Sequence, residues 1–316
     1  MTAECIRSLF AMKADDYQIL VVDNGSRDGS VDYLRNEFPQ ITVFPQERNL
    51  GFAAGCNVGM RHALEEGFEY VLLINNDTVV DPAFLSALVD EAQRTPDAAI
   101  LSPKIYFFDA PDRFWWAGGA FSLWVGIARH VGRKQVDAGQ FDLPGPIDWA
   151  TGCALLVKCE ALRQVGLFDE RLFGNGEDLD ISLRMRRVGY RIWFVPQAKI
   201  WHKEGVDYRK NAGEHVRKFT GTRNLLWVMH EHAGTLQWIS FLPNFVLRHA
   251  LFYILLGIWQ RDYRSAKAVF GGILAFFRMC SHPELSHLPV ELTAGNESTS
   301  PVRPPVRREE RTIETE

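Results

Sequence analysis

Two groups of carboxylates, far apart in the chain, stand where they could act on a charged substrate. Asp77 ends the polar motif at residues 75–77, directly after the apolar run at residues 70–74. Glu177 and Asp178 stand at the start of a helical pattern. A carboxylate at the end of a strand suits a hard divalent cation, and a carboxylate facing a cleft can serve as a general base. These are the two functions needed to move a group off a nucleotide diphosphate.

Each of these carboxylates also has a structural explanation. The helix dipole alone favours acidic residues in a first turn, which accounts for one or two of Glu177, Asp178 and Asp180 but not readily for all three. Asp77 could simply cap a strand, although its place after a strongly apolar strand favours a function. His202 follows a further apolar run and could complete the shell of a metal ion, but a single histidine is more often structural.

Polar residues after the first apolar run could contact a nucleotide. Asp23 and Asn24 follow residues 19–22, whose pattern predicts a buried strand. A carboxylate at the carboxyl end of such a strand can accept hydrogen bonds from a base or from ribose hydroxyls. The alternative is a turn in which the Asp23 side chain bonds its own backbone.

The segment at residues 49–59 is rich in glycine and stands at an expected helix start. Backbone amides at a helix N-terminus, together with small side chains, suit a diphosphate. Gly55 and Gly59 lie one helical turn apart, however, and could equally allow close helix packing.

The composition limits which classes of protein this chain can belong to. The chain of 316 residues is 47% hydrophobic, which is enough for the core of one or two domains. Its formal net charge of −4 suggests no polyanionic partner, so we expect no binding of nucleic acid. The five cysteines lack the spacing of zinc or redox sites, and reduced thiols in a cytoplasmic setting are the simplest interpretation. No secretory signal is visible at the amino end.

Strand and helix patterns alternate along residues 1–105. Apolar runs at 19–22, 41–44 and 70–74 predict strands, and the amphipathic stretches between them predict helices. This alternation is typical of a parallel sheet covered by helices on both faces.

Residues 106–150 change character, because they are rich in Trp, Phe and Gly and show little periodicity. They predict short strands and loops. Regular patterning then returns, with a predicted strand at 153–157, a helix at 178–187 and two strands at 191–195 and 199–202.

The region at residues 213–280 is helical and markedly apolar. Its centre, residues 236–259, approaches the length of a membrane span but is interrupted by Pro243 and Arg248. An interfacial helix pair on a membrane and a helix pair docked on the protein's own surface both remain open at this point. Pro, Ser, Glu and Arg dominate the last residues, which predicts a disordered tail. The predicted division is a catalytic domain at 1–210, a helical region at 211–285 and a tail at 286–316.

The ordered set of motifs resembles the family-2 glycosyltransferases, and most nearly their rhamnosyltransferase-like branch. The matching segments are residues 21–26, 49–57, 75–77, 165–170 and 176–180, together with Gly152, Arg184, residues 189–190 and His202. Each motif alone is unspecific, but the whole order is hard to obtain by chance, and it covers roughly residues 5–230. The resemblance implies an α/β, GT-A type, Rossmann-like and mostly parallel sheet flanked by helices, followed by an apolar helical extension.

The same resemblance implies an inverting, metal-dependent glycosyltransferase. Such an enzyme moves a sugar, with rhamnose as one candidate, from a dTDP- or UDP-sugar donor to a hydroxyl of a glycan or lipid-linked acceptor in cell-wall or surface polysaccharide synthesis. Asp178 aligns with the catalytic base, with Glu177 beside it. Asp77 would anchor Mg²⁺ or Mn²⁺, and His202 matches a position near the metal or the diphosphate.

Further residues receive binding roles from the resemblance. Those implied for the donor are Asp23, Asn24, Asn49, Gly51, Asn57 and Asn76. Those implied for the acceptor are Trp149, Thr151 and Gly152, and the ring of Trp149 could stack on a sugar.

One departure from the family pattern concerns the start of the fold. Members of the family normally have an apolar strand ahead of the helix represented here by residues 5–10. That strand is central in the sheet, and removing it exposes two unpaired edges. We therefore expect a sheet that lacks its first strand. Either the true start of the protein lies upstream of Met1, which the intact downstream motifs favour, or the protein is degenerate. If the chain as given is the whole protein, we expect weak donor binding and poor solubility.

Two other functions were weighed. Nucleotidyl transfer usually calls for a glycine-rich loop with basic residues after the first strand, and none is visible. A degenerate, non-catalytic carbohydrate-binding or scaffold protein would explain the missing strand, but Asp77, Glu177 and Asp178 argue against it. The sequence does not identify the sugar, the acceptor, the linkage or the oligomeric state. The expected location is cytoplasmic, with peripheral contact at the inner face of the cell membrane as a hypothesis drawn from residues 236–259.

Overall fold

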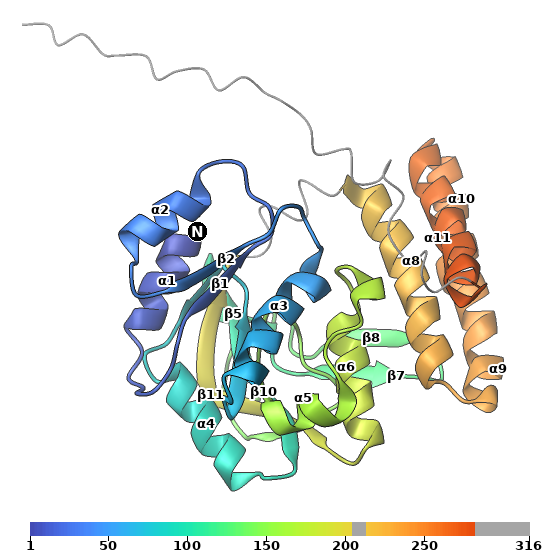
Figure 1. The fold of residues 1–316 in the computed structure, drawn as a ribbon. Helices are drawn as coiled ribbons and strands as arrows, with labels where there is room; N and C mark the ends of the chain where they lie inside the picture. The colour runs from blue at the N-terminus through green and yellow to red at the C-terminus, as the bar shows by residue number, and fades with distance from the viewer. Residues whose placement is uncertain (204–212, 282–316) are drawn as a thin grey trace, which may run out of the picture.

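The protein combines an α/β body with a group of long helices that stands beside it. The computed structural model describes residues 1–203 and 213–281, and Figure 1 shows both parts. The predicted tail at residues 286–316 lies outside the described residues.

A small parallel sheet forms the amino-terminal part of the body. Its elements are α1 (Thr2–Phe10), β1 (Leu20–Asp23), α2 (Ser30–Glu37), β2 (Thr42–Pro45) and α3 (Phe52–Glu65). β1 pairs in parallel with β2. Ile6 of α1 and Leu34 of α2 are buried together against this sheet, which gives it a small core of its own.

A seven-stranded sheet forms the centre of the body. Its main path is β3 (Tyr70–Ile74), β10 (Ala154–Lys158), β5 (Ala98–Phe107), β11 (Arg191–His202) and β4 (Thr78–Val80), while β6 (Ala110–Trp116) pairs with β5 and β9 (Gly145–Ile147) with β11. β10 is antiparallel to both β3 and β5, and β11 is parallel to β5. β3, β5 and β11 therefore run in the same direction, and their carboxyl ends share one edge.

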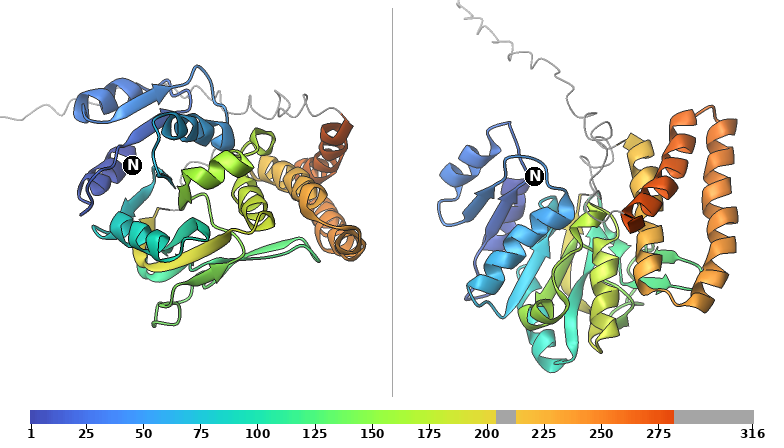
Figure 2. Two further views of the ribbon diagram at one scale, coloured as in Figure 1. Left: turned by 60° about the horizontal axis from the view of Figure 1, so that its bottom comes forward. Right: turned by 45° about the vertical axis from the view of Figure 1, so that its right-hand side comes forward.

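Different helices cover the two faces of this sheet (Figures 1 and 2). Leu101 belongs to a core with Leu88 of α4 (Phe84–Arg94), whereas its neighbour Ile100 belongs to a core with Met60 of α3. Successive side chains of a strand point to opposite faces, so a single strand supports both cores. α5 (Cys159–Val165) and α6 (Glu177–Arg187) complete the second core.

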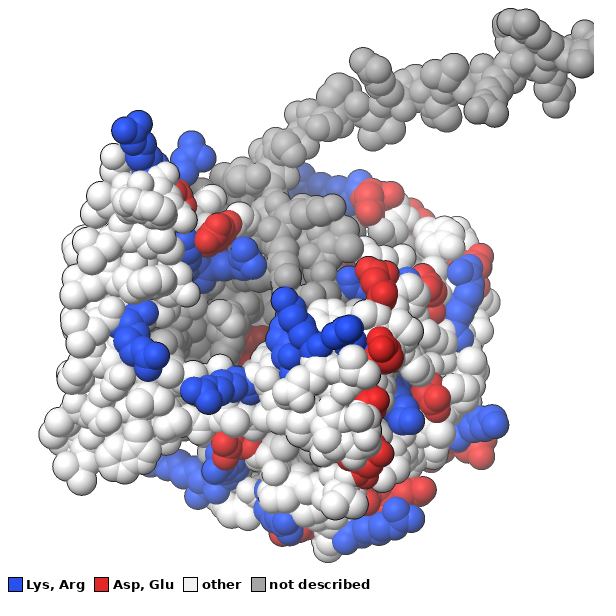
Figure 3. Space-filling model, turned by 180° about the vertical axis from the view of Figure 1, so that it is seen from behind, with Lys and Arg blue, Asp and Glu red and all other residues white. Residues whose placement is uncertain are grey.

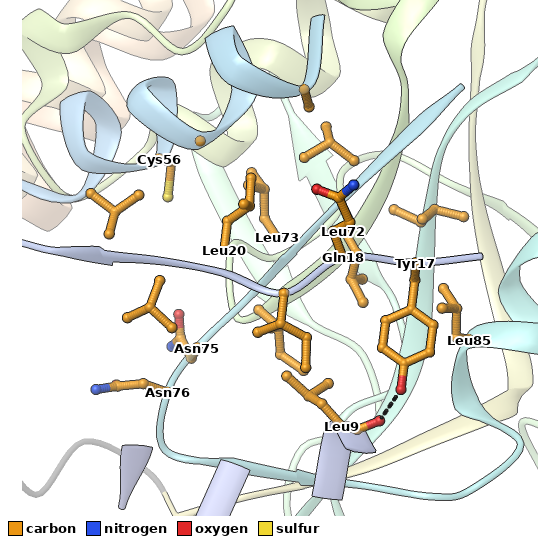
Figure 4. Close-up of a pocket in the computed structure, with 18 of the residues that line it drawn as sticks. Leu9, Tyr17, Gln18, Leu20, Cys56, Leu72, Leu73, Asn75, Asn76 and Leu85 are labelled. Atoms are coloured by element: carbon orange, nitrogen blue, oxygen red, sulfur yellow. Dashed lines mark hydrogen bonds between the residues drawn. The ribbon is translucent and has the colours of Figure 1, made fainter. Parts of the chain in front are cut away.

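β1 and β3 do not pair with each other. Each uses one edge only, β1 toward β2 and β3 toward β10, within the part of the chain that the structure describes. A cavity of about 1160 Å³ separates their other edges, and Figure 4 shows the side chains that line it. The expected lack of a first strand is thus visible as an open slot in the fold.

Most predicted elements form close to their expected bounds. The strand at residues 70–74 is β3, and the helix predicted at 178–187 starts one residue earlier, at Glu177. The two strands predicted after residue 190 join into the single strand β11, which changes register between Val195 and Lys199. The long strand β5 was not anticipated as one element.

The carboxy-terminal helices form two layers. α8 (Gly213–His232) lies against the body, and α11 (Tyr263–Ser281) packs along α8. In the chain, α8 and α11 are joined by a continuous helical stretch made of α9 (Thr235–Asn244), the π-helical segment η2 (Phe245–Leu251) and α10 (Phe252–Trp259). The right panel of Figure 2 shows this stretch on the side away from the body.

Candidate active site

Asp77 and His202 meet at the carboxyl edge of the large sheet. Asp77 lies in the turn between β3 and β4, and His202 is the last residue of β11, where it pairs with Thr78. Asp77 Oδ1 lies 3.1 Å from His202 Nε2, and their side chains are 13% and 6% exposed. The ring of Trp115 packs edge-on against His202 at 4.6 Å between centroids. The pair is therefore held rigidly at the end of two strands.

This pair suits a divalent cation whose remaining ligands come from a substrate. Among residues 1–203 and 213–281, no group of three His, Cys, Asp or Glu side chains is arranged to hold a metal ion. Mg²⁺ and Mn²⁺ accept carboxylate oxygen, keep several waters and are commonly shared with substrate phosphates. The carboxylate of Asp77 and the imidazole of His202 fit such a shared site.

Asp178 is oriented by backbone amides from two directions. α6 begins after Gly176, whose φ of +94° turns the chain into the helix. The amide of Gly152 donates to Asp178 Oδ2 at 2.8 Å, and the amide of Leu179 donates to Oδ1 at 2.8 Å. These bonds fix the carboxylate against the loop that precedes β10.

The environment of α6 favours proton uptake by its first two carboxylates. Burial, and then the charge of Asp178, raise the pKa of Glu177 to about 8. Burial also raises the pKa of Asp178, against the opposing effect of the amides of Gly152 and Leu179. Two interacting carboxylates titrate as a pair, so the pair holds a proton at a higher pH than a free carboxyl group does.

A short path of hydrogen bonds links the two acidic centres. The Asn75 amide, just after β3, donates to the Cys153 carbonyl at 2.8 Å. Gly152, the residue before Cys153, binds Asp178 as described above. The turn that carries Asp77 and the loop that contacts Asp178 are thus neighbours at one edge of the sheet, as the strand ends predict.

Several of the residues predicted to bind a donor belong to a loop beside β1 that is held together by hydrogen bonds. Asn24 Nδ2 donates to the Gly51 carbonyl at 2.9 Å, and the Leu50 amide donates to Asn24 Oδ1 at 2.8 Å. Asn49 Oδ1 accepts from the Gly51 amide at 2.8 Å. Asp23 Oδ2 accepts from the Ser26 amide at 2.9 Å, so this carboxylate forms the local turn that was the alternative to a nucleotide contact.

Gly51 is confined by its neighbours. Its φ is +84°, and a Cβ atom there would lie 2.4 Å from the Phe173 carbonyl oxygen. That same oxygen accepts hydrogen bonds from the amides of Phe52 and Ala53, at 2.6 and 3.4 Å. The first amides of α3, which the sequence suggested for a diphosphate, are therefore bonded to the loop before α6 in this structure.

Four other predicted site residues have structural contacts. Asn57 is 2% exposed and binds the backbone of Phe168, both through its Nδ2 at 2.9 Å and through its Oδ1 at 3.0 Å. Asn76 Nδ2 donates to Thr2 Oγ1 at 2.9 Å. Trp149 is 6% exposed and packs edge-on against Trp116, so its ring offers no open face for a sugar here. Thr151 is buried beside Gly152.

Sequence analysis missed a set of polar contacts that α8 makes to the site. Asn224 Nδ2 donates to the carbonyls of Leu172 and Asn175, at 2.7 and 2.6 Å. His232 Nε2 lies 2.8 Å from Asp180 Oδ1, in the first turn of α6. The available signal was the polar run at residues 220–224 inside an apolar helical pattern. α8 thus anchors both the loop and the helix that carry Asp178.

Comparison with known proteins decides the family. A family model described as glycosyl transferase family 2 matches residues 1–166. The chain belongs to this family. Within this glycosyltransferase, Asp77 lies in the matched part of the chain, whereas Asp178 and His202 both lie after it.

Two of the curated relatives of this glycosyltransferase carry the names of sugar transferases. An N-acetylglucosaminyl-diphospho-decaprenol L-rhamnosyltransferase of Mycobacterium tuberculosis is 26% identical over 224 residues, which cover 63% of this chain and 70% of the relative. Galactofuranosyltransferase GlfT1 of the same species is 30% identical over 195 residues, which cover 61% of this chain and 62% of the relative.

Solved structures share the fold of this glycosyltransferase at low sequence identity. The mannosyltransferase PcManGT of Pyrobaculum calidifontis, solved with GDP-mannose and Mn²⁺, is 17% identical with a TM-score of 0.51, covering 93% of this chain and 74% of that one. TarS of S. aureus, residues 1–349, is 14% identical with a TM-score of 0.53, covering 93% and 83%. These likenesses support the predicted fold class.

Proposed function

We propose that this glycosyltransferase transfers a sugar from a nucleoside diphosphate donor to a hydroxyl group with inversion at the anomeric carbon. The observation that carries the proposal is the Asp178 carboxylate, fixed by the Gly152 amide at the sheet edge where the Asp77–His202 pair lies. The acceptor hydroxyl attacks from the face opposite the nucleotide, and Asp178 accepts its proton. Glu177 is buried beside this base and raises the energy of a second negative charge there.

Asp77 and His202 would hold the divalent cation. When bound, the ion supplies positive charge to the diphosphate that leaves with the nucleotide. The proposal of a cation draws support from the donor set of the pair and from the Mn²⁺ in the structure of the mannosyltransferase. Asp23, Asn24 and the loop tied to Asn24 are proposed to form the nucleotide side of the site.

The acceptor is proposed to be a glycan or a lipid-linked sugar of the cell wall or cell surface. Rhamnose and galactofuranose are the two sugars that the names of the relatives suggest, and dTDP and UDP are the two proposed carriers. Thr151 and Gly152 would face the acceptor because they lie beside Asp178. Asp23 would not distinguish the two carriers, since both bases present similar edges to it.

We further propose that this cytoplasmic enzyme meets a lipid surface through its outer helices. One helical stretch among the described residues, Thr235–Trp259, is long and apolar enough to cross a membrane by length and composition, and 22% of an apolar window of 18 residues within it is buried. Its exposed side chains include Leu247, Leu255 and Trp259, and Figure 3 shows this side of the molecule as largely uncharged. Arg248, Arg261 and Arg264 could contact anionic headgroups, as in interfacial helices.

A panel of nucleotide sugars tests the proposal. Purified protein is incubated with dTDP-rhamnose, UDP-galactofuranose, UDP-glucose and GDP-mannose, each with Mn²⁺, Mg²⁺ or EDTA, and nucleotide release is measured. Release from one donor that disappears with EDTA supports the proposal. Folded protein that binds a nucleotide sugar and releases no nucleotide under any condition favours the non-catalytic alternative.

A further inference from the structure

A small cavity lies beside the start of α6, the helix that carries Asp178. Its volume is about 130 Å³, and Asn175 and Gly176, directly before α6, form one of its walls. The other walls come from α8 and from the hairpin of β7 (Gly119–Ser122) and β8 (Ile127–His130). These walls are small or apolar at Phe121, Gly126, Ala128, Gly221, Leu225 and Val228. The cavity therefore suits an apolar group of modest size next to the proposed base.

The hairpin that bounds this cavity also contacts the outer helices. A Cβ atom at Gly126 would lie 2.4 Å from the ring of Phe241 in α9. Trp124, in the turn of the same hairpin, is 52% exposed, and Ile239 of α9 is 62% exposed. The cavity therefore lies between the start of α6 and the apolar surface that is proposed to meet a lipid.

Arg217 lies on the face of α8 that borders the cavity. Arg217, Gly221, Asn224 and Val228 follow one another at intervals of four, three and four residues, which places them on one side of the helix. The last three of these residues line the cavity. A Cβ atom at Gly221 would lie 3.5 Å from Asn175 Nδ2, so this face of α8 meets the loop before α6. Arg217 lies one turn earlier, about 6 Å along the helix axis.

Arg217 is a partly buried cation whose charge is not matched by a carboxylate of the described residues. Its Nε atom is buried and has no hydrogen-bond partner among them. By contrast, the next residue, Lys218, pairs with Glu214, and Arg184 of α6 pairs with Asp180. Figure 3 shows further Lys and Arg side chains around a hollow between the helices and the body. A guanidinium group in such a place is suited to a phosphate, whose oxygens it can bind in pairs.

We propose that the acceptor is a phosphorylated lipid that carries a sugar, that Arg217 binds its phosphate, and that the cavity takes the start of its hydrocarbon chain. This inference rests on the proposed transfer at Asp178 and narrows the acceptor of that reaction. Asp178 and Arg217 lie on either side of Asn175, so a sugar between them could present its hydroxyl to the base and its phosphate to the guanidinium. A phosphate in a membrane headgroup has the same chemistry, and the test separates the two sources.

The binding of three short probes tests the proposal without any transfer of sugar. Geranyl diphosphate, geraniol and inorganic pyrophosphate are titrated into the full chain by calorimetry, with EDTA present so that no divalent cation holds a diphosphate at Asp77. The variants are Arg217→Gln and Ala128→Leu, the second of which fills part of the cavity. Lys218→Gln is the matched control, because it removes a cation from the neighbouring position of the same helix.

The parent chain should bind geranyl diphosphate at least about tenfold more tightly than either geraniol or pyrophosphate. Arg217→Gln should weaken the binding of geranyl diphosphate by about tenfold or more, while Lys218→Gln leaves it unchanged. Ala128→Leu should weaken the binding of geranyl diphosphate but not that of pyrophosphate. Equal affinity of the parent chain and Arg217→Gln overturns the proposal, and so does equal affinity of the parent chain for all three probes.

Two further measurements separate the source of the phosphate. Sedimentation of Arg217→Gln with phosphatidylglycerol vesicles should match that of the parent chain, and a loss would assign Arg217 to headgroups and overturn the proposal. The affinity for UDP with Mn²⁺ should also be unchanged, and a loss would assign Arg217 to the donor instead. If Arg217→Gln does not fold, Arg217→Lys keeps the charge without the paired donors, and it should still weaken the binding of geranyl diphosphate.

The outcome also distinguishes this inference from the proposed function. A chain that binds geranyl diphosphate through Arg217 but transfers no sugar would contradict the proposed transfer alone. A chain that transfers sugar but binds the three probes alike would contradict this inference alone.

Discussion

At the scale of single residues, the site depends on how backbone amides position carboxylates. Asp178 accepts from Gly152 on one side and from Leu179 on the other, so its oxygens are fixed before any substrate arrives. Glu177 is 5% exposed, and its second carboxyl oxygen has no hydrogen-bond partner among the described residues. A buried carboxyl group in that situation prefers its neutral form. Glu177 therefore holds a proton at neutral pH, and removing this proton lowers the stability of the folded protein.

The stability of the protein should therefore depend on pH through Glu177. Its pKa rises from 4.5 in the unfolded chain to about 8 in the folded protein, so the folded state binds the extra proton between these values. The free energy of unfolding should fall as pH rises through this window. Glu177→Gln should remove much of that slope in urea unfolding at pH 5, 7 and 9. Exposed Glu160→Gln is the control, and equal slopes in both variants would contradict the assignment.

Asp77 should control metal affinity. Asp77→Asn keeps the shape of the side chain but removes its charge, so Mn²⁺ binding in the presence of UDP should weaken by at least about tenfold. Titration calorimetry measures the change. Asp109→Asn, in an exposed turn, should leave the affinity unchanged. An unaltered affinity of the Asp77→Asn variant would show that Asp77 is not a ligand of the cation.

Local sequence patterns located these residues, but tertiary contacts decided their roles. The position of Asp77 after β3 and of Asp178 at the start of α6 follows from strand and helix patterns. Trp149 looked suited to stack on a sugar, yet its ring is packed against Trp116. Asn57 looked like a donor contact, yet it bonds Phe168, which lies 111 residues away in the chain. Contacts over such separations leave no local signal.

At the scale of elements, α8 belongs to the catalytic body through polar contacts as well as apolar ones. Asn224 bonds the loop before α6, and Trp227 Nε1 donates to Asp169 Oδ2 at 3.0 Å in the same loop. The predicted boundary at residue 210 therefore separates segments that are joined by buried hydrogen bonds. Sequence alone favoured the boundary because the apolar character rises sharply there.

Removing the Asn224 amide should destabilise the whole body. Asn224→Ala leaves the carbonyls of Leu172 and Asn175 without their donor, and a buried unsatisfied group costs about 1–3 kcal/mol. The free energy of unfolding, measured in urea, should fall by that amount. Asn244→Ala is the control, because the Asn244 amide bonds the Ser240 carbonyl within its own helix. A loss no larger than that of the control would mean that α8 docks through apolar contacts alone.

At the scale of the whole molecule, two large surfaces lack a partner within the described residues. One is the slot between β1 and β3, and the other is the exposed face of α9, η2 and α10. The family resemblance led to the expectation of a missing strand, and the sequence pattern predicted an apolar helical region but left open whether it docks on the protein's own surface. The sequence pattern did not show that α8 packs against the site while α9, η2 and α10 lie away from it. All of these helices are apolar, and their periodicity does not indicate which of them is more exposed.

The outer helices should bind anionic vesicles. Leu247 and Leu255 are 65% and 61% exposed. Replacing both by glutamate should weaken binding by about tenfold or more, because each leucine that becomes buried in the membrane contributes about 1.5–3 kcal/mol. Sedimentation with vesicles of phosphatidylglycerol and phosphatidylcholine measures the effect. Leu143→Glu is the control, since Leu143 is 84% exposed in a loop of the body. Equal binding by the parent chain, the double variant and the control would show that this apolar face does not bind the vesicles.

The most direct test of the account is the rate of sugar transfer by an Asp178→Asn variant. The variant is compared with the parent chain and with Glu160→Gln, using the donor that the nucleotide-sugar panel identifies and saturating Mn²⁺. The account predicts a loss of about 10²–10⁴-fold in the transfer rate, the usual contribution of a general base, with donor affinity unchanged. A variant that transfers sugar as fast as the parent would contradict the assignment of Asp178 as the base.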